Sequence, residues 1–334
     1  MNSERREFLA LAGAAAVAGY AGFSGGRKAP PAASGKASPQ RLWAGSTAQV
    51  AVVKSASYSH DVAGEMLRGI LECGLDVAGK RVLLKPNLVE FDFNTCINTD
   101  VAVVAAALDV FQSLGAAEVR IGEGPGHRRD TYAIAELTRY RTELPRFDQV
   151  FIDLNRQDVS AVQGFADRQE FYFANAVFEA DLIVSLAKMK THHWAGATLS
   201  MKNYFGLVPG SIYGWPKNEL HYIGIPTAIT ELTRHFGPKS FAIVDGIVGM
   251  EGNGPIQGSP KNVGVLVMGS NLPAVDATCC RIMGIDPAKI EYLQMAADVL
   301  GVTDEARIEQ IGESIQSVRT NFQLIDNFKS VRLA

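Results

Sequence analysis

Short apolar runs that alternate with helical patterns constrain the fold of this chain most strongly. The run from Asp181 to Leu186 is typical of a strand that is buried on both faces. Further strands are expected at Gln49–Val53, Arg81–Lys85, Glu118–Ile121, Gln149–Leu154, Ser240–Asp245 and Asn262–Gly269. Helices are expected at Asp61–Gly74, Asp100–Leu114, Asp130–Tyr140, Thr198–Phe205, Ile223–Phe236 and Leu272–Met283. This alternation predicts a layered α/β fold with a mostly parallel, Rossmann-like sheet, in one domain or in two lobes with the site between them.

The N-terminal segment is typical of an export signal. Arg5 and Arg6 resemble the twin-arginine motif, and an apolar Ala/Gly-rich run follows them. We therefore expect a signal peptide at residues 1–24, a disordered linker at 25–47, the α/β domain at 48–284 and a C-terminal extension at 285–334 packed on it. The expected partner is the twin-arginine translocase, and the mature protein is expected in the periplasm without a stable membrane span. A cytoplasmic helix with a chance arginine pair is the alternative.

Charge and cysteine content exclude two classes of partner. The net charge is −3, so the chain lacks the basic surface that nucleic-acid binding requires. The four cysteines have neither CxxC nor ferredoxin-like spacing, so no iron–sulfur cluster is expected.

The segment from Lys188 to His221 carries the strongest chemical signal. It holds three of the six histidines of the chain and is rich in lysine, whereas Glu219 is its only carboxylate. The segment also follows the strand at Asp181–Leu186, and ligands of open α/β sheets bind beyond the carboxyl ends of strands. A cationic segment at that edge predicts a site for a small anionic ligand or a metal.

Other expected strands also end in residues that can do chemistry. Lys85 and Asn87 end one strand, and His127 lies in a glycine-rich loop after another. Asp245 and Glu251 flank a further glycine-rich stretch, where carboxylates suit acid–base catalysis or a hard cation. Each of these groups is also compatible with an ordinary turn or a solvated loop. Four such groups at equivalent strand ends favour a shared site.

Several motifs together resemble the bacterial family known as domain of unknown function 362 (DUF362). They are Leu84 to Val89, Lys190 to His193, Thr198 to Gly206, Glu251 to Pro255 and Ala274 to Asp276, followed by Met283 and Gly284. The resemblance covers roughly Val50 to Gly284 and carries no settled activity with it.

A more distant resemblance is to nickel-pincer lactate racemase. It rests on His192 to Lys202, the Pro209-Gly210 pair and the loop at His127, although Leu199 to Met201 are bulkier than the small residues of that family. The resemblance implies that Lys202 carries a nickel-containing, nucleotide-derived cofactor and that His221 binds the metal. It also implies that His127 and His192 act as acid and base.

These observations give one set of predicted site residues. The predicted catalytic residues are His127, His192 and Glu251; the predicted cofactor-binding residues are Lys85, Asn87, Lys190, Lys202 and Asn203; the predicted metal ligands are His193, His221 and Asp245. They favour an exported enzyme, isomerase- or racemase-like or redox, that acts on a small anionic substrate with a cofactor or metal. A periplasmic protein that binds an anion, metal or nucleotide without turnover is the alternative. A structural factor is a third, and it predicts no cavity with perturbed titratable groups.

Overall fold

The computed structural model describes residues 43, 45–126 and 130–334, which belong to one compact unit. Within these ranges, the main sheet contains nine strands in the order β11-β1-β10-β9-β7-β2-β3-β4, and β8 pairs with β7. The strands are β1 (Ala48–Lys54), β2 (Arg81–Pro86), β3 (Glu118–Glu123), β4 (Phe151–Asp153), β7 (Leu182–His192), β8 (Gly196–Thr198), β9 (Ser240–Asn253), β10 (Gln257–Gly269) and β11 (Ile308–Gly312). A separate two-stranded sheet pairs β5 (Val159–Gln163) with β6 (Glu170–Ala174).

The sheet is mostly parallel, as predicted. Strand β7 runs parallel to both β2 and β9, and the pairs β2–β3, β3–β4 and β1–β11 are also parallel. Strand β10 is antiparallel to β1 and β9, and β8 is antiparallel to β7. The carboxyl ends of β2, β3 and β7 therefore meet at one edge of the sheet.

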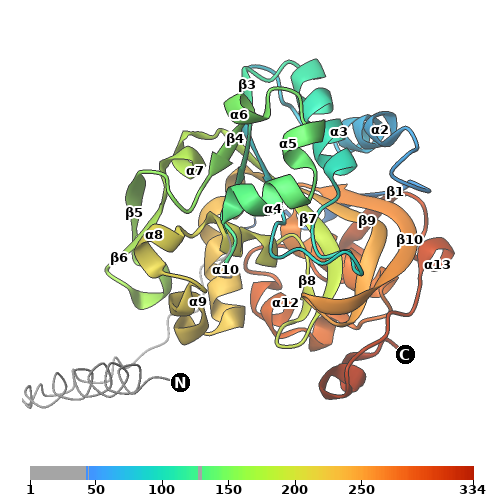
Figure 1. The fold of residues 1–334 in the computed structure, drawn as a ribbon. Coiled ribbons are helices and arrows are strands. Elements are labelled where there is room, and N and C mark those ends of the chain that lie inside the picture. Colours follow the sequence, from blue (N-terminus) through green and yellow to red (C-terminus); the bar gives the residue numbers. More distant parts are fainter. Residues whose placement is uncertain (1–42, 44, 127–129) are drawn as a thin grey trace, which may run out of the picture. The chain divides into compact units, whose positions relative to one another are not determined.

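Helices cover both faces of the sheet (Figure 1). The longer ones are α2 (Val62–Glu72), α3 (Val101–Ser113), α10 (Ile225–Phe236) and α11 (Leu272–Ile282), and the shorter ones are α4 (Thr131–Leu137), α5 (Tyr140–Glu143), α6 (Phe147–Val150), α7 (Asn175–Glu179), α8 (Gly210–Tyr213), α9 (Asn218–Ile223), α12 (Glu291–Ala296) and α13 (Ile315–Val318). The apolar core is divided accordingly. Alternate residues of β7, such as Val184 and Leu186, pack with α2 and α3, whereas Ala187 and Met189 pack with α10, α11 and α12.

Three local predictions differ from the structure. Strand β7 does not end at Leu186 but continues to His192, because β8 and β9 pair with its last residues. The expected loop at 246–255 is instead the end of β9, which pairs with β10 as a long hairpin. The expected short helix from Thr198 is a 3₁₀ segment, η2 (Lys202–Leu207), that directly follows β8 by way of a turn.

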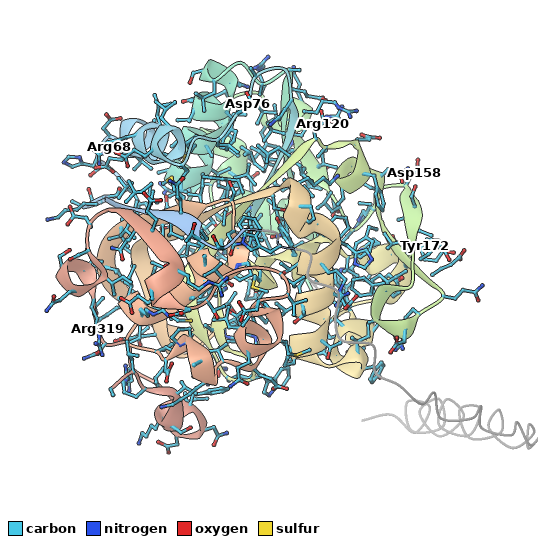
Figure 2. All side chains as sticks on the ribbon, turned by 180° about the vertical axis from the view of Figure 1, so that it is seen from behind. Arg68, Asp76, Arg120, Asp158, Tyr172 and Arg319 are labelled. Atoms are coloured by element: carbon cyan, nitrogen blue, oxygen red, sulfur yellow. The ribbon has the colours of Figure 1, made fainter. Side chains whose placement is uncertain are left out.

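Ordinary charged residues lie on the outside of the molecule. Figure 2 shows Arg68, Asp76 and Arg319 at the surface, and all three are exposed. No helix in the described ranges is long and apolar enough to cross a membrane. The lysines at the carboxyl edge of the sheet differ from this pattern, because several of them are buried.

Candidate functional site

A cavity of about 450 Å³ lies at the carboxyl edge of β2, β3 and β7. Its walls are rich in amines, amides and imidazoles, and among the described residues Glu123 is its only carboxylate. The polar residues that line it include Lys85, Asn87, Glu123, Lys190, His192, His193, Lys202, Asn203, Lys217 and His221. The cavity therefore brings together eight residues that the sequence predicted for binding or catalysis, and it adds Glu123 and Lys217.

The first amine of the cavity, Lys85, is neutralised by a carboxylate. Its Nζ lies 2.6 Å from Glu123 Oε2, and both side chains are buried. Glu123 also accepts hydrogen bonds from the backbone N–H groups of Leu88 and Gly124. Burial lowers the pKa of Lys85, and the charge of Glu123 opposes that shift. This pair is a fixed part of the cavity wall because each charge is satisfied by the other.

A glycine allows this wall to form. A Cβ atom at Gly206 would contact Glu123 Oε1 and would lie 2.6 Å from Lys85 Nζ. Real Cβ atoms do not approach neighbours so closely, so only glycine lets the backbone of η2 pass beside the ion pair.

The second amine, Lys190, is held by neutral groups alone. Its Nζ donates to Asn87 Oδ1 at 2.7 Å and to the carbonyl oxygen of Ile97 at 2.8 Å. Asn203 extends this network, since its Oδ1 accepts from Asn87 Nδ2 and from Lys85 Nζ. Burial lowers the pKa of Lys190 well below its ordinary value, and the charges of the other lysines nearby lower it further.

Lys202 differs from the other amines because it is only partly buried and faces the cavity. Within the described ranges it makes no hydrogen bond or ion pair, and its Nζ lies 4.5 Å from the centre of the Phe205 ring. Burial lowers its pKa to about 8. At neutral pH this amine is largely cationic and available to a ligand.

Lys217 is the fourth amine of the cavity. It is 2% exposed and donates to the carbonyl oxygen of Gly124. Its backbone has φ of 63°, a left-handed conformation that is uncommon outside glycine and that aims this lysine inward from the start of α9. Burial lowers its pKa to about 7, and the charge of Glu123 opposes that shift.

The hydrogen bonds of His192 fix its protonation state. Its Nδ1 accepts from the backbone N–H groups of Trp194 and Ala195 at 3.0 and 3.1 Å, so Nδ1 carries no proton and Nε2 carries one. Burial, followed by the charge of Lys202, lowers the pKa of His192 far below its usual range. The ring is therefore a neutral imidazole whose Nε2–H can donate a hydrogen bond.

The other two cavity histidines lie closer to the opening. His193 donates from Nδ1 to the carbonyl oxygen of Gly254 at 2.7 Å, so its Nε2 is the acceptor nitrogen. His221 is exposed on α9 and packs edge-on against Trp194, with ring centres 5.8 Å apart.

Two predicted carboxylates lie outside the cavity lining. Asp245 is buried and bound to Lys188 at 2.8 Å and to Tyr58, because Asp245 on β9 pairs in register with Lys188 on β7. Glu251 lies on the β9–β10 hairpin, where it accepts from the backbone N–H of Gln323.

The predicted metal set is not assembled in this arrangement. Asp245 is committed to Lys188 and does not join His193 and His221. In residues 45–126 and 130–334, no three His, Cys, Asp or Glu side chains are placed to hold a metal ion. We therefore derive no chemistry through a metal. His127 lies outside the described residues.

Of the two cavity residues that sequence reasoning missed, only Glu123 had a strand-end signal. Glu123 ends β3 as Lys85 ends β2, and these two strands are parallel neighbours. Their strand-end positions alone could have paired them. Lys217 had only its place in the cationic segment, and nothing near it in sequence shows that it is buried.

The chain is similar in sequence to known proteins. Residues 82–281 match the family described as a domain of unknown function, DUF362. A thylakoid-associated protein of Synechocystis sp. is 30% identical over 271 residues, which are 77% of this chain and 81% of that protein. These matches confirm the predicted family.

Two solved structures are also similar to this chain. The lactate racemase apoprotein of Thermoanaerobacterium thermosaccharolyticum has 12% identity and a TM-score of 0.45, and the alignment covers 71% of this chain and 57% of that one. A Thermotoga maritima protein has 16% identity and a TM-score of 0.41, with 65% and 58% covered. The chain thus spans less than two thirds of either structure, and no feature of the site is taken from them.

Proposed function

The chain belongs to the DUF362 family, and we propose that it is an enzyme whose cavity acts on a small anionic substrate. The observation that supports this most directly is the amine of Lys202. It faces the cavity without a hydrogen-bond or ion-pair partner in the described ranges. An amine in that position is available to bind or react with a ligand.

The charge of the cavity supports an anion as that ligand. Lys85 is paired with Glu123, but Lys190, Lys202 and Lys217 have no carboxylate partner among the described residues. Buried cations are costly unless an opposite charge compensates them. A carboxylate or phosphate group of a substrate would supply that charge.

The protonation states support proton-transfer chemistry. The pKa of Lys202 is about 8, so near neutral pH its amine can exchange a proton with a bound substrate. The neutral Nε2–H of His192 can donate to an oxygen on which negative charge develops. We therefore assign the role of base to the neutral form of Lys202, which about one molecule in eleven carries at pH 7, and the role of hydrogen-bond donor to His192, in place of the acid–base role predicted for His192. This division suits an isomerase-like reaction at a carbon beside a carboxylate.

Binding without turnover is the second candidate function. It is favoured by Glu123, because the only carboxylate lining the described cavity is held by Lys85 and two backbone N–H groups. No second free acid faces Lys202 from the described residues. A cavity with one base and one donor can bind an anion without turning it over.

Solvent deuterium incorporation separates these two functions. The full chain would be incubated in D₂O with a panel of small 2-hydroxy and 2-oxo acids, and proton exchange beside the carboxylate would be followed by NMR. We expect exchange in at least one acid, and Lys202→Met should slow it by at least ~100-fold, the scale of one catalytic acid–base group. Lys54→Met, an exposed lysine on β1, is the matched control and should retain the full rate.

The possible results have different consequences. Binding of an acid without exchange would favour the second candidate. Exchange that survives Lys202→Met would remove Lys202 from the mechanism. If none of the acids bound or exchanged, the proposal of a small-carboxylate enzyme would be overturned.

We further propose that the protein is exported by the twin-arginine pathway. Support comes from Arg5, Arg6 and the apolar run after them, which all lie outside the described residues. Replacement of both arginines by lysine should leave the protein in the cytoplasmic fraction of its host. Unchanged export of that variant would refute the proposal.

A further inference from the structure

We propose that the cavity selects ligands with two negative charges, such as a dicarboxylate or a phosphate, and that it takes up protons when such a ligand binds. This inference rests on the proposed function, because it concerns the same cavity. It adds the charge class of the ligand and a role for Lys217, and it has a test of its own.

Among the described residues, amines outnumber carboxylates on the cavity wall. The ion pair of Lys85 and Glu123 is neutral as a unit, with 2.6 Å between its charged atoms. In the part of the chain that the structure describes, the remaining amines can carry three positive charges, on Lys190, Lys202 and Lys217. A single negative charge would leave two of these cations uncompensated, whereas a dianion would leave one. A dianion therefore compensates the wall better.

The amines of Lys190 and Lys217 contact neutral acceptors. Lys190 is fully buried and is bound by an amide oxygen and backbone carbonyls, and Lys217 is bound by a backbone carbonyl. These neutral acceptors satisfy N–H groups but do not replace the hydration that a buried ammonium group loses. The free cavity consequently holds fewer protons than its amines could carry.

The lowered pKa values of the three lysines agree with these contacts. The pKa of Lys217 is lowered to about 7 and that of Lys202 to about 8, both by burial. The pKa of Lys190 is lowered well below its ordinary value, by burial first and then by Lys202 and Lys188. A bound dianion acts in the opposite direction, because a nearby negative charge favours the protonated amine.

Proton uptake has a calculable effect on affinity. At pH 8, an amine with a pKa of about 7 is protonated in only about one free molecule in eleven. If the ligand raises that pKa to about 10 or above, binding at pH 8 takes up about 0.9 proton at Lys217. The dissociation constant then rises by nearly tenfold per pH unit between pH 8 and 9, for each lysine that behaves in this way. For a ligand that remains a dianion throughout this range, affinity therefore falls as the pH rises above 7.

Titration calorimetry of the full chain tests the inference. Malonate is the dianionic probe, and monomethyl malonate is a monoanion of similar shape. At pH 8 we expect malonate to bind at least tenfold more tightly. We also expect the binding enthalpy to change between Tris and Hepes buffers in proportion to at least half a proton taken up for each malonate bound.

Two variants of Lys217 locate the proton uptake. Lys217→Met should remove the part of the uptake that belongs to this lysine and weaken malonate binding. Lys217→Arg is the second variant, because arginine stays charged throughout this pH range. It should keep the preference for malonate while losing the proton uptake at this position. Lys54→Met is again the control and should behave as the parent chain does.

The remaining outcomes overturn the inference. Equal affinity for the two probes, absence of proton uptake, or uptake that is not reduced in Lys217→Arg each contradict it, as does failure of malonate to bind. None of these results decides the proposed function, because deuterium exchange into 2-hydroxy or 2-oxo acids is measured separately. Exchange without a dianion preference would leave the enzyme proposal in place and remove only this inference.

Discussion

Replacing Glu123 by glutamine should destabilise the fold by about 3 kcal/mol, because it leaves Lys85 buried without a counter-charge. Removal of one partner from a buried pair costs about 3–5 kcal/mol. We expect the lower end, since Lys85 keeps Pro86 O at 2.7 Å and Asn203 Oδ1 at 3.1 Å as acceptors. For a unit of this size, the melting temperature should fall by about 6 °C.

The cost should shrink as the pH rises. Without Glu123, the charge that opposes the lowering of the Lys85 pKa is absent, so the pKa of the folded state falls further. Between that pKa and the unfolded value near 10.4, the unfolded chain binds more protons than the folded one. The unfolding free energy of the variant therefore rises with pH, by up to about 1.4 kcal/mol per pH unit. The gap to the parent protein should narrow as the pH rises toward the lowered Lys85 pKa of the parent and should stay constant above it.

Urea denaturation at several pH values measures this gap. Asp245→Asn is the matched control, because it breaks the buried pair with Lys188 outside the cavity. Both variants should lose stability, but only Glu123→Gln should also change malonate binding, and it should tighten it, because Lys85 then joins the amines of the cavity wall that have no carboxylate partner. A loss below about 1 kcal/mol for Glu123→Gln would place this pair among ordinary surface ion pairs and refute the argument. A gap that widens with pH would refute the assignment of Lys85 as the stranded charge.

Three further predictions follow from other contacts. Burial raises the pKa of Asp276 to about 7, so between pH 4 and 7 the folded protein binds more protons than the unfolded chain and loses stability as the pH rises. Asp276→Asn should flatten this slope in urea denaturation. Parallel stability profiles of the variant and the parent would exclude Asp276 as its cause. The ring of His192 should stay in its Nε2–H form down to pH 5 in nitrogen NMR spectra, and a titration between pH 5.5 and 7 would contradict the hydrogen bonds to its Nδ1. Gly206→Ala should lower the free energy of unfolding by about 1–3 kcal/mol through overpacking and should weaken malonate binding. Gly237→Ala is the control and should do neither, because its Cβ would lie 3.4 Å from Thr233. Equal effects of the two variants would refute the close approach at Gly206.

Local sequence patterns were sufficient for most strands of the main sheet, although not for β8 and β11, and for many of the cavity residues. Apolar runs such as Leu182 to Leu186 can be stable only between two covered faces, so they predicted the sheet. Parallel strands end at a common edge, so the residues that follow them, including Lys85 and Asn87, could be expected to meet. Lys202 and His192 lie in the segment that follows one of these strands, and the resemblance to lactate racemase singled them out within it.

The sequence did not indicate which acid would face the cavity. Asp245 ends an apolar run in the sequence and Glu123 ends β3, and only Asp245 was selected, although it proves to lie within β9. The order of strands places β9 beside β7 in a register that pairs Asp245 with Lys188, two residues before the cavity lysine Lys190. Glu123 reaches the cavity because β3 lies beside β2. Strand order and register depend on contacts across the whole domain.

The sequence by itself determined the alternation of elements, the family and the edge of the sheet at which charged residues gather. Only the tertiary structure decided which lysines have a carboxylate partner and which have none among the described residues. Lys85 and Lys188 find carboxylates 38 and 57 residues away, whereas Lys190 and Lys202 find none in the described ranges. The physical reason is that burial and pairing are set by residues distant in sequence, and these contacts fix the charge and pKa of each amine.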